Sequence, residues 1–105
     1  MVNLSVNLCG KELKNPVIPA SGTFGFGREF QELYDISVLG GVATKGLTLA
    51  PRLGNAVPRI AESHGTILNA VGLQNPGVES FLKNDLEWLK RKTRVLANAA
   101  GSTLS

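Results

Sequence analysis

The stretch Gly-Gly-Val-Ala-Thr-Lys-Gly at residues 40–46 decides the fold. Its apolar residues form a short run that stops abruptly at a Lys-Gly pair, which is typical of a short buried strand. Residues 17–20 (Val-Ile-Pro-Ala) and residues 95–101 (Val-Leu-Ala-Asn-Ala-Ala-Gly) have the same character. The sequence therefore predicts three short buried strands.

Amphipathic helices separate these strands. Residues 28–35 and residues 78–89 repeat apolar side chains at helical spacing. The apolar positions are Phe30, Leu33 and Tyr34 in the first segment, and Val78, Phe81, Leu82, Leu86 and Leu89 in the second. Short buried strands that alternate with amphipathic helices predict an α/β fold with a parallel sheet.

The remaining segments form connections and an N-terminal hairpin. Residues 4–8 alternate apolar and polar side chains, and residues 11–13 can return as the second arm of a hairpin. Residues 48–67 mix prolines and glycines with scattered charge, so we expect a long excursion with room for a small hairpin. Asn75 suits the N-cap of the second helix, and Pro76 suits its first helical position.

Composition and length bound the class of protein. The 105 residues are 43% hydrophobic and 18% charged, as in a folded domain. No apolar run approaches the roughly 20 residues of a membrane helix, and no signal-peptide pattern opens the chain. With a single cysteine, Cys9, these features favour a cytoplasmic protein that binds no membrane. Three strands would leave an open sheet with unpaired edges, which is an unfavourable place for a domain to end.

The net charge of +3 is a weak guide to partners. Four of the eleven basic residues lie together at positions 90–94. They could form a nucleic-acid patch, or they could complement the dipole at the C-terminal end of a helix. No aromatic side chains are interleaved with them, as single-strand binding needs, so the helix-end interpretation is favoured and no nucleic acid is expected.

Polar side chains stand at the end of each predicted strand: Ser21, Lys45 and Asn98. Ligands of parallel α/β folds bind at the carboxyl ends of strands, so we expect these three residues to share a site. Taken alone, Lys45 is better explained as a lysine whose ammonium reaches solvent, but the other polar strand ends and the nearby amides favour a binding role. Residues 69–75 add amide side chains, which suit the edges of a flat polar ring. The residues by themselves predict a site for a small polar or anionic ligand.

Other residues give weaker signals. His64 has no His or Cys partner at metal spacing, so no metal site is expected. Cys9 falls in a predicted turn, where a structural role is favoured over a nucleophile. Residues 22–27 (Gly-Thr-Phe-Gly-Phe-Gly) lack the spacing of a dinucleotide loop and the ending of a phosphate loop.

Five separated motifs together resemble one family. They are N-P-V-I-P-A-S-G-T-F-G-F-G (15–27), A-T-K-G (43–46), P-R-L-G-N-A-V-P-R (51–59), L-N-A-V-G-L-Q-N-P-G (68–77) and A-N-A-A-G-S (97–102). In this order they are similar to the dihydroorotate dehydrogenases. The forms S-G-T-F-G-F-G and L-Q-N-P-G resemble the class 1, NAD-linked (1B-type) catalytic subunits. The resemblance spans essentially the whole chain.

The resemblance implies an FMN-containing TIM (β/α)8 barrel that oxidises (S)-dihydroorotate to orotate in pyrimidine (UMP) biosynthesis. It implies cofactor contacts for Ser21, Lys45, Gly46 and Asn98. It implies substrate contacts for Lys45 and for Asn69, Ala70, Val71, Gly72 and Leu73. A TIM barrel takes about 250 residues and eight strands, so residues 1–105 would supply its N-terminal hairpin and about three strands.

The resemblance also implies parts outside this chain. The family's base is a cysteine on a later loop, so no catalytic residue is expected before Ser105. Electrons would pass to NAD+ through a partner subunit that carries FAD and an iron–sulfur cluster, in a hetero-oligomer. We therefore predict that the 105-residue chain by itself is inactive. The alternatives are another flavin barrel, similar to dihydropyrimidine dehydrogenase or dihydrouridine synthase, and a non-catalytic partial barrel that serves binding or assembly.

Overall fold

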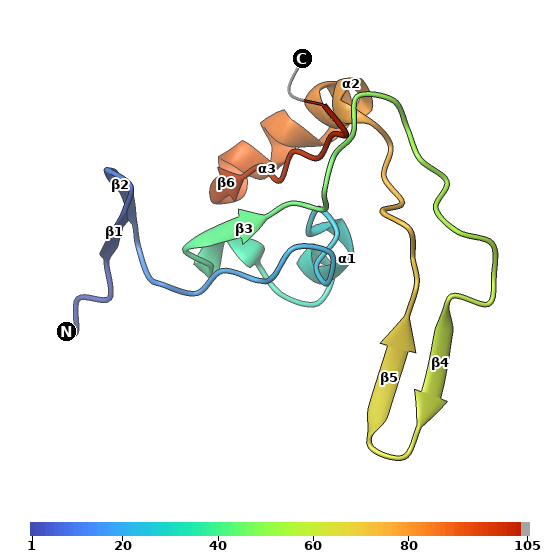
Figure 1. Cartoon of the computed structure of the whole chain (residues 1–105). Helices are drawn as coiled ribbons and strands as arrows, with labels where there is room; N and C mark the ends of the chain where they lie inside the picture. Colours follow the sequence, from blue (N-terminus) through green and yellow to red (C-terminus); the bar gives the residue numbers. More distant parts are fainter. Residues whose placement is uncertain (104–105) are drawn as a thin grey trace.

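The computed structural model describes residues 1–103, and its elements are short (Figure 1). In chain order they are β1 (Val6–Leu8), β2 (Lys11–Leu13), α1 (Arg28–Gln31), the 3-10 helix η1 (Ile36–Val38), β3 (Gly41–Ala43), β4 (Ile60–Ser63), β5 (Thr66–Asn69), α2 (Val78–Phe81), the π-helix η2 (Leu82–Leu86), α3 (Glu87–Lys92) and β6 (Arg94–Leu96). The α2, η2 and α3 segments follow one another without a break.

Strands β3 and β6 form the centre of the molecule. They pair in parallel, with Val42 opposite Val95. The pairing continues beyond both strands, where Leu47 bridges to Ala99 and the Leu47 N–H donates to the Asn98 carbonyl at 2.8 Å. The helical segment α2–η2–α3 lies between β3 and β6 in the chain, as the crossover of a parallel pair requires. The predicted parallel α/β arrangement is confirmed for this pair.

Residues 17–20 do not form the predicted strand. The Val17 carbonyl accepts a hydrogen bond from the Gly40 N–H at 3.0 Å, but no ladder follows it. Pro16 and Pro19 have no N–H to donate, so they interrupt the series of hydrogen bonds that a strand needs. The prediction was wrong here, and the parallel sheet of the described residues has two strands.

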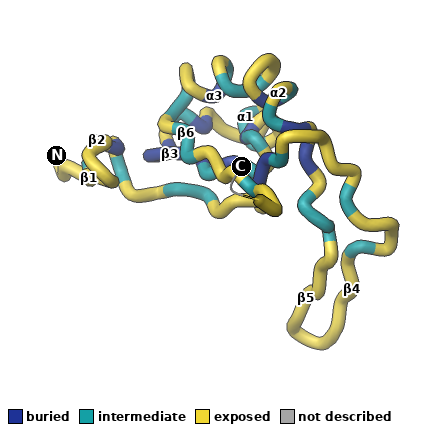
Figure 2. Tube along the Cα trace, turned by 45° about the horizontal axis from the view of Figure 1, so that its top comes forward, coloured by how far each residue is buried: buried dark blue, intermediate teal, exposed yellow. Residues whose placement is uncertain are grey.

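The hydrophobic core lies between this sheet and the helices. Its buried side chains are Phe24, Ile36, Leu39, Val42 and Leu89. Figure 2 shows most buried segments gathered around β3, β6 and the helices, whereas the β4–β5 hairpin is exposed. Phe24 belongs to the loop before α1, so burying it ties that loop to β3 and α3.

The first helix is shorter than predicted. It ends at Gln31 instead of reaching Asp35, and the Leu33 side chain is 79% exposed. Asp35 accepts a hydrogen bond from the Ser37 N–H at 3.1 Å and caps η1. Such local side-chain contacts of Asp compete with helical backbone hydrogen bonds, which is why the helical pattern did not hold to Asp35.

The second helix begins later than predicted. Gly77, with a φ of 83°, precedes its first residue, Val78. Asn75 is therefore not its N-cap, and Pro76 is not its first helical residue. Asn75 accepts a hydrogen bond from the Gly77 N–H at 2.9 Å, so it still serves the turn that leads into the helix. The helix ends as expected, with the basic residues Lys90, Arg91 and Lys92 in the last turn of α3.

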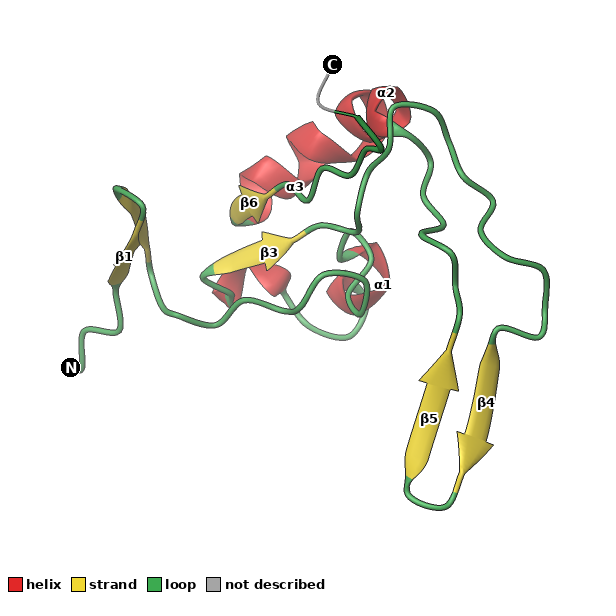
Figure 3. Cartoon of the chain, viewed as in Figure 1, coloured by secondary structure: helices red, strands yellow, loops and turns green. Residues whose placement is uncertain are grey.

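The segment at residues 48–75 leaves the body as a long arm (Figure 3). Strands β4 and β5 pair antiparallel along it, from Ile60 opposite Asn69 to Ser63 opposite Thr66. The predicted small hairpin is confirmed, although it extends to Asn69. At the base of the arm, Arg52 and Asn75 exchange backbone hydrogen bonds at 2.9 and 3.0 Å. The tip is thus exposed while the two ends of the arm are held together.

The N-terminal hairpin is also confirmed. Strands β1 and β2 pair antiparallel, with Val6 opposite Leu13, although β1 begins at Val6 rather than at Leu4. Leu13 is buried, whereas the rest of the hairpin is exposed. Within residues 1–103, no helix combines the length and the apolar character needed to cross a membrane.

Candidate functional site

Three segments far apart in the sequence meet beyond the carboxyl ends of β3 and β6. The Ser21 hydroxyl donates to the Thr44 carbonyl at 2.6 Å, and the Asn98 side-chain amide donates to the Ser21 hydroxyl oxygen at 3.0 Å. The Asn98 N–H donates to the hydroxyl oxygen of Thr44, a fully buried residue, at 3.0 Å. The expected meeting of Ser21 and Asn98 next to Lys45 is therefore present, although Ser21 follows a loop and not a strand.

Lys45 lies in this group without a partner of its own. It is half-buried, and within the described residues no hydrogen bond or ion pair engages its ammonium. A Cβ atom on Gly22 would lie 3.6 Å from the Lys45 Nζ, so the ammonium stands beside a bare stretch of backbone. A positive charge held in place without a carboxylate is available to an anionic or electron-rich ligand.

Gly46 is packed closely against its neighbours in this cluster. It is buried, and a Cβ atom there would lie 2.7 Å from the Leu73 Cδ1 and 3.5 Å from the Asn98 Nδ2. Any side chain at this position would displace Leu73. The residues expected to contact the cofactor, together with Leu73 from the substrate set, thus form one cluster.

The remaining substrate residues lie on the arm side of this cluster. Asn69 ends β5 and is exposed, so it stands furthest along the arm. The Asn55 side-chain amide donates to the Ala70 carbonyl at 2.9 Å, and the Asn55 N–H donates to the Val71 carbonyl at 3.0 Å. Gly72 follows with a φ of 80° and leads the chain back to Leu73. The loop reaches the site through its C-terminal part.

Sequence reasoning missed Arg59, which fixes this loop. Its guanidinium donates to the Asn55 carbonyl at 2.6 Å, the Leu53 carbonyl at 2.7 Å and the Gln74 Oε1 at 2.7 Å. The backbone carbonyl of Arg59 accepts a hydrogen bond from the Ala70 N–H at 2.8 Å. Gln74 therefore serves the arm. A proline- and glycine-rich segment forms few backbone hydrogen bonds of its own, so an arginine within it could have been expected to donate to its carbonyls.

Asn75 joins the two ends of the arm from a buried position. Its Oδ1 accepts from the Thr48 N–H at 3.1 Å and the Gly77 N–H at 2.9 Å. Its Nδ2 donates to the Leu73 carbonyl at 2.8 Å and the Thr48 hydroxyl oxygen at 3.0 Å. Asn75 was expected as a helix N-cap, and it binds backbone groups of Thr48, Leu73 and Gly77 instead.

His64 and Cys9 lie away from the cluster. His64 is at the exposed tip between β4 and β5, and Cys9 is in the exposed turn between β1 and β2. No group of three or more His, Cys, Asp or Glu residues suited to a metal ion occurs within residues 1–103.

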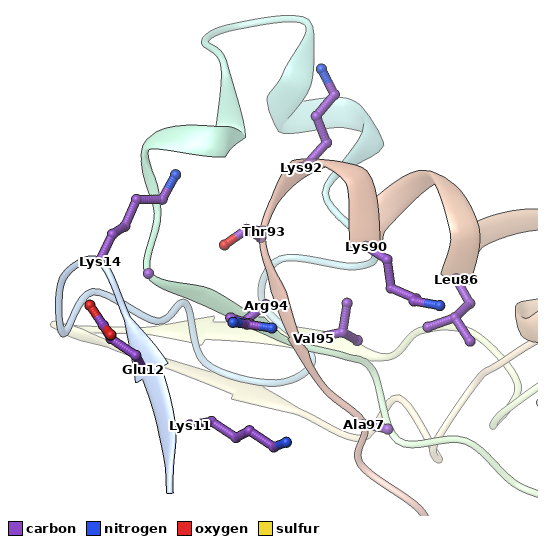
Figure 4. Close-up of a pocket in the computed structure, with 11 residues that line it drawn as sticks. Lys11, Glu12, Lys14, Leu86, Lys90, Lys92, Thr93, Arg94, Val95 and Ala97 are labelled. Atoms are coloured by element: carbon purple, nitrogen blue, oxygen red, sulfur yellow. The ribbon is translucent and has the colours of Figure 1, made fainter. Parts of the chain in front are cut away.

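A wide hollow lies between the N-terminal hairpin and β6 (Figure 4). It measures about 760 Å³, and its charged lining comes from β2 and from the region around α3 and β6. The charged residues are Lys11, Glu12, Lys14, Lys90, Lys92 and Arg94. Size alone would favour this hollow as a binding site. The cluster at Lys45 is the stronger candidate because polar groups from three separate segments converge there beside the carboxyl ends of the strands.

Comparison with known proteins agrees with the motifs. Residues 3–105 match the family model described as dihydroorotate dehydrogenase. The chain belongs to the dihydroorotate dehydrogenase family. The expected family is therefore confirmed, and the match covers nearly every residue of the chain.

Similar members of this family are NAD-linked subunits. The catalytic subunit of dihydroorotate dehydrogenase B (NAD+) from Bacillus pumilus is 58% identical over 100 residues, which are 94% of this chain and 32% of the relative. The same subunit from Petrotoga mobilis is 54% identical over 105 residues, which are 99% of this chain and 35% of the relative. The chain thus spans about a third of the length of the curated relatives it matches.

A solved structure of DHODH from Eimeria tenella, in complex with ferulenol, has a similar fold. It aligns with 92% of this chain at a TM-score of 0.60 and 23% sequence identity, and the match covers 28% of that chain. At this identity the likeness concerns the fold alone.

Proposed function

We propose that the protein containing this chain oxidises (S)-dihydroorotate to orotate in pyrimidine biosynthesis, with FMN as its cofactor. One observation carries the proposal. Ser21, Lys45 and Asn98 come from three separate motifs and gather at the strand ends, and the Lys45 ammonium lies beside the Gly22 backbone without a hydrogen bond or ion pair among the described residues. The names of the similar relatives agree with this activity.

The residues present fit a flavin. A flat ring with polar edges needs hydrogen-bonding groups at its rim and backbone without side chains along its face. The Ser21 hydroxyl and the Asn98 amide would supply the first, and Gly22 beside Lys45 would supply the second. Lys45 would place a positive charge where negative charge develops on the ring. FMN, when bound, supplies the hydride acceptor.

The same cluster would orient the substrate. Dihydroorotate carries a carboxylate and a ring with amide groups, so it needs one cation and several neutral donors and acceptors. Lys45 would offer the cation, and the proposed substrate contacts from the arm are Asn69, Ala70, Val71, Gly72 and Leu73. We assign no proton-accepting residue to this chain, because Cys9 lies in the distant hairpin turn and the Ser21 hydroxyl donates to Thr44. The family's base cysteine is proposed to lie beyond Ser105.

The wider setting follows from the similar relatives and is part of the proposal. The segment would be the N-terminal part of a single TIM barrel, in which further strands pair with the open edges of β3 and β6. Electrons would reach NAD+ through a partner subunit with FAD and an iron–sulfur cluster, in the cytoplasm. The relatives are called catalytic subunits, which agrees with a hetero-oligomer.

The test uses the protein expressed from its complete gene. After acid release, bound flavin is identified by chromatography, and oxidation is assayed with dihydroorotate, dihydrouracil and tRNA dihydrouridine as separate substrates. FMN with dihydroorotate oxidation is expected. A preference for dihydrouracil or dihydrouridine would replace the proposal with another flavin barrel, and neither flavin nor oxidation would favour a binding or assembly module.

The role of Lys45 is tested by Lys45→Ala. We expect a loss of about 100-fold or more in kcat/KM, typical of removing one preorganised charge from a site. Lys11→Ala is the matched control, because Lys11 is an exposed lysine on β2 that lines the separate hollow beside β6. Equal effects of the two substitutions would contradict the assignment.

A further inference from the structure

Arg28 connects the loop before α1 to the distant helical segment. Its Nε donates to the Asp85 carboxylate at 2.7 Å, and its Nη2 donates to the Asn84 carbonyl at 2.7 Å. The guanidinium carbon also lies 4.5 Å from the centre of the Trp88 ring. One side chain thus contacts a carboxylate, a backbone carbonyl and an aromatic ring, and all three lie more than fifty residues later in the chain.

These contacts fall on an unusual turn. Asn84 and Asp85 belong to the π-helix η2, and Trp88 follows in α3. Single π-helical turns inside α-helices are rare and occur frequently at functional sites. The Asp85 side chain is only 14% exposed, against 49% for Arg28. A carboxylate so covered needs its partner, so this pair differs from an ordinary surface ion pair.

The loop that Arg28 ends is the one that carries Ser21. Phe24 is buried in the core, and the Phe26 ring lies 4.9 Å from the Phe81 ring of α2. Gly27 turns the chain with a φ of 87° into α1. Ser21 and Gly22 begin the loop at the site, and Arg28 fixes its other end. The contacts of Arg28 and of Phe26 thus join the C-terminal end of this loop to the helical segment α2–η2–α3.

We propose that Arg28 is a positioning residue: by holding Asp85, Asn84 and the Trp88 face, it sets residues 21–27 at the strand ends and so shapes the cofactor site. The inference rests on the proposed flavin function. Arginine suits the role because its planar fork reaches two acceptors and stacks on a ring at once. A lysine has a single point charge and cannot do all three.

The first measurement needs no cofactor. In protein expressed from its complete gene and freed of flavin, hydrogen exchange reports how often the amides of residues 22–27 open. Arg28→Ala should speed their exchange by about tenfold, while the amides of β3 keep their rates. Lys90→Ala is the matched control, because it removes the exposed Glu87–Lys90 pair on the same helix and should change neither set.

The second measurement separates positioning from stability. Arg28→Ala leaves the covered Asp85 charge unpaired, which by itself destabilises the fold. The double variant Arg28→Ala with Asp85→Asn removes that charge, so its unfolding midpoint should return toward the original value. If Arg28 positions the loop, the FMN dissociation constant of the double variant stays raised, by about tenfold. The FMN dissociation constant of Arg28→Lys should fall between those of the unsubstituted protein and of Arg28→Ala.

The outcomes separate the two proposals. Faster loop exchange with a raised FMN dissociation constant supports the role of Arg28. Unchanged loop exchange in Arg28→Ala overturns it, and so does full recovery of FMN affinity in the double variant. If the unsubstituted protein binds no FMN, the proposed function fails. The exchange measurement then still decides whether Arg28 holds the loop.

Discussion

Asn75 shows how one buried amide can organise two segments. It is 6% exposed, and its oxygen and nitrogen both find backbone partners, on Thr48, Leu73 and Gly77. A carboxylate only accepts, an ammonium only donates, and a hydroxyl has a single hydrogen to donate where Asn75 Nδ2 donates to two acceptors. Position 75 therefore links the loop of the candidate site to the base of the arm.

Replacing this residue should be costly. Asn75→Ala removes a partner from the buried N–H of Gly77 and from part-buried backbone groups of Thr48 and Leu73, so we expect a loss of about 3 kcal/mol in unfolding free energy. Urea unfolding of the protein from the complete gene measures it. Asn84→Ala is the control, since its exposed amide only contacts Ser80 at 3.2 Å. A loss as small as the control's would show that Asn75 is not a structural link.

Asp35 makes the stability of the fold depend on pH in the acid range. Hydrogen bonds from the Ser37 hydroxyl and the Ser37 N–H lower the pKa of Asp35 from its ordinary value of 3.8, and Lys92 adds a smaller effect. A depressed carboxyl pKa stabilises the fold at pH values above 3.8, and this contribution is lost as the pH falls through the lowered pKa. Stability should therefore fall below pH 3.8.

The substitution Ser37→Ala tests this linkage. It removes the hydroxyl donor, which lies 2.7 Å from the Asp35 Oδ2, so the pKa of Asp35 should rise toward its ordinary value. An NMR titration of the Asp35 carboxyl carbon measures the shift. An unchanged titration would mean that the hydroxyl does not stabilise the carboxylate.

At the level of elements, the arm depends on Arg59 and not on packing. Side chains of β4 and β5 are exposed along both strands, and Ile60, Ile67 and Leu68 are each more than 60% exposed. With little buried area to hold it, the segment is shaped by polar contacts of the kind that Arg59 makes. Arg59 thus sets the course of residues 70–74.

Loss of Arg59 should weaken substrate binding more than it slows the chemical step. Arg59→Ala frees residues 70–74, so we expect KM for dihydroorotate to rise about tenfold while kcat falls less, because binding is the step most affected. Steady-state kinetics measures both. Arg91→Ala, an exposed arginine in the last turn of α3, is the control. A fall in kcat alone would place Arg59 nearer the reacting atoms than the structure indicates.

The same elements show what could be predicted from the sequence. The β3–β6 pairing and the meeting of Lys45 with Asn98 followed from apolar runs that stop at polar residues, because parallel strands end at one edge. The strand at 17–20 failed because the pattern of apolar side chains says nothing of the N–H groups that prolines remove. The π-helical turn and the grip of Arg28 on it depend on contacts between distant segments. Local sequence does not carry such contacts.

As a whole, the molecule is extended for its length. Its radius of gyration is 15.7 Å, whereas a compact domain of this size has about 13 Å. Large apolar side chains stay exposed on the arm, among them Leu49, Leu53 and Val57. The edges of the two-stranded parallel sheet are unpaired within the described residues. An exposed apolar surface of this extent is typical of a surface that other protein covers.

This shape predicts the behaviour of residues 1–105 expressed alone. We expect neither tightly bound FMN nor dihydroorotate oxidation, because half of the cofactor's surroundings and the open sheet edges lack partners. Flavin content and an oxidation assay on the purified 105-residue chain measure this, with the protein from the complete gene as control. Turnover by the short chain would contradict it.

The two ends of the arm are joined by hydrogen bonds at its base, or root, so the tip between them is free to vary over evolutionary time. Arg52 and Asn75 exchange backbone hydrogen bonds, and the Val78 N–H donates to the Thr48 carbonyl at 2.9 Å. Lengthening a loop whose ends are already joined costs little, since closure entropy grows only slowly with length. Insertions near His64 would therefore leave the strand ends in place. Descendants of one ancestral gene could acquire new surfaces at this tip while inheriting the chemistry at the root.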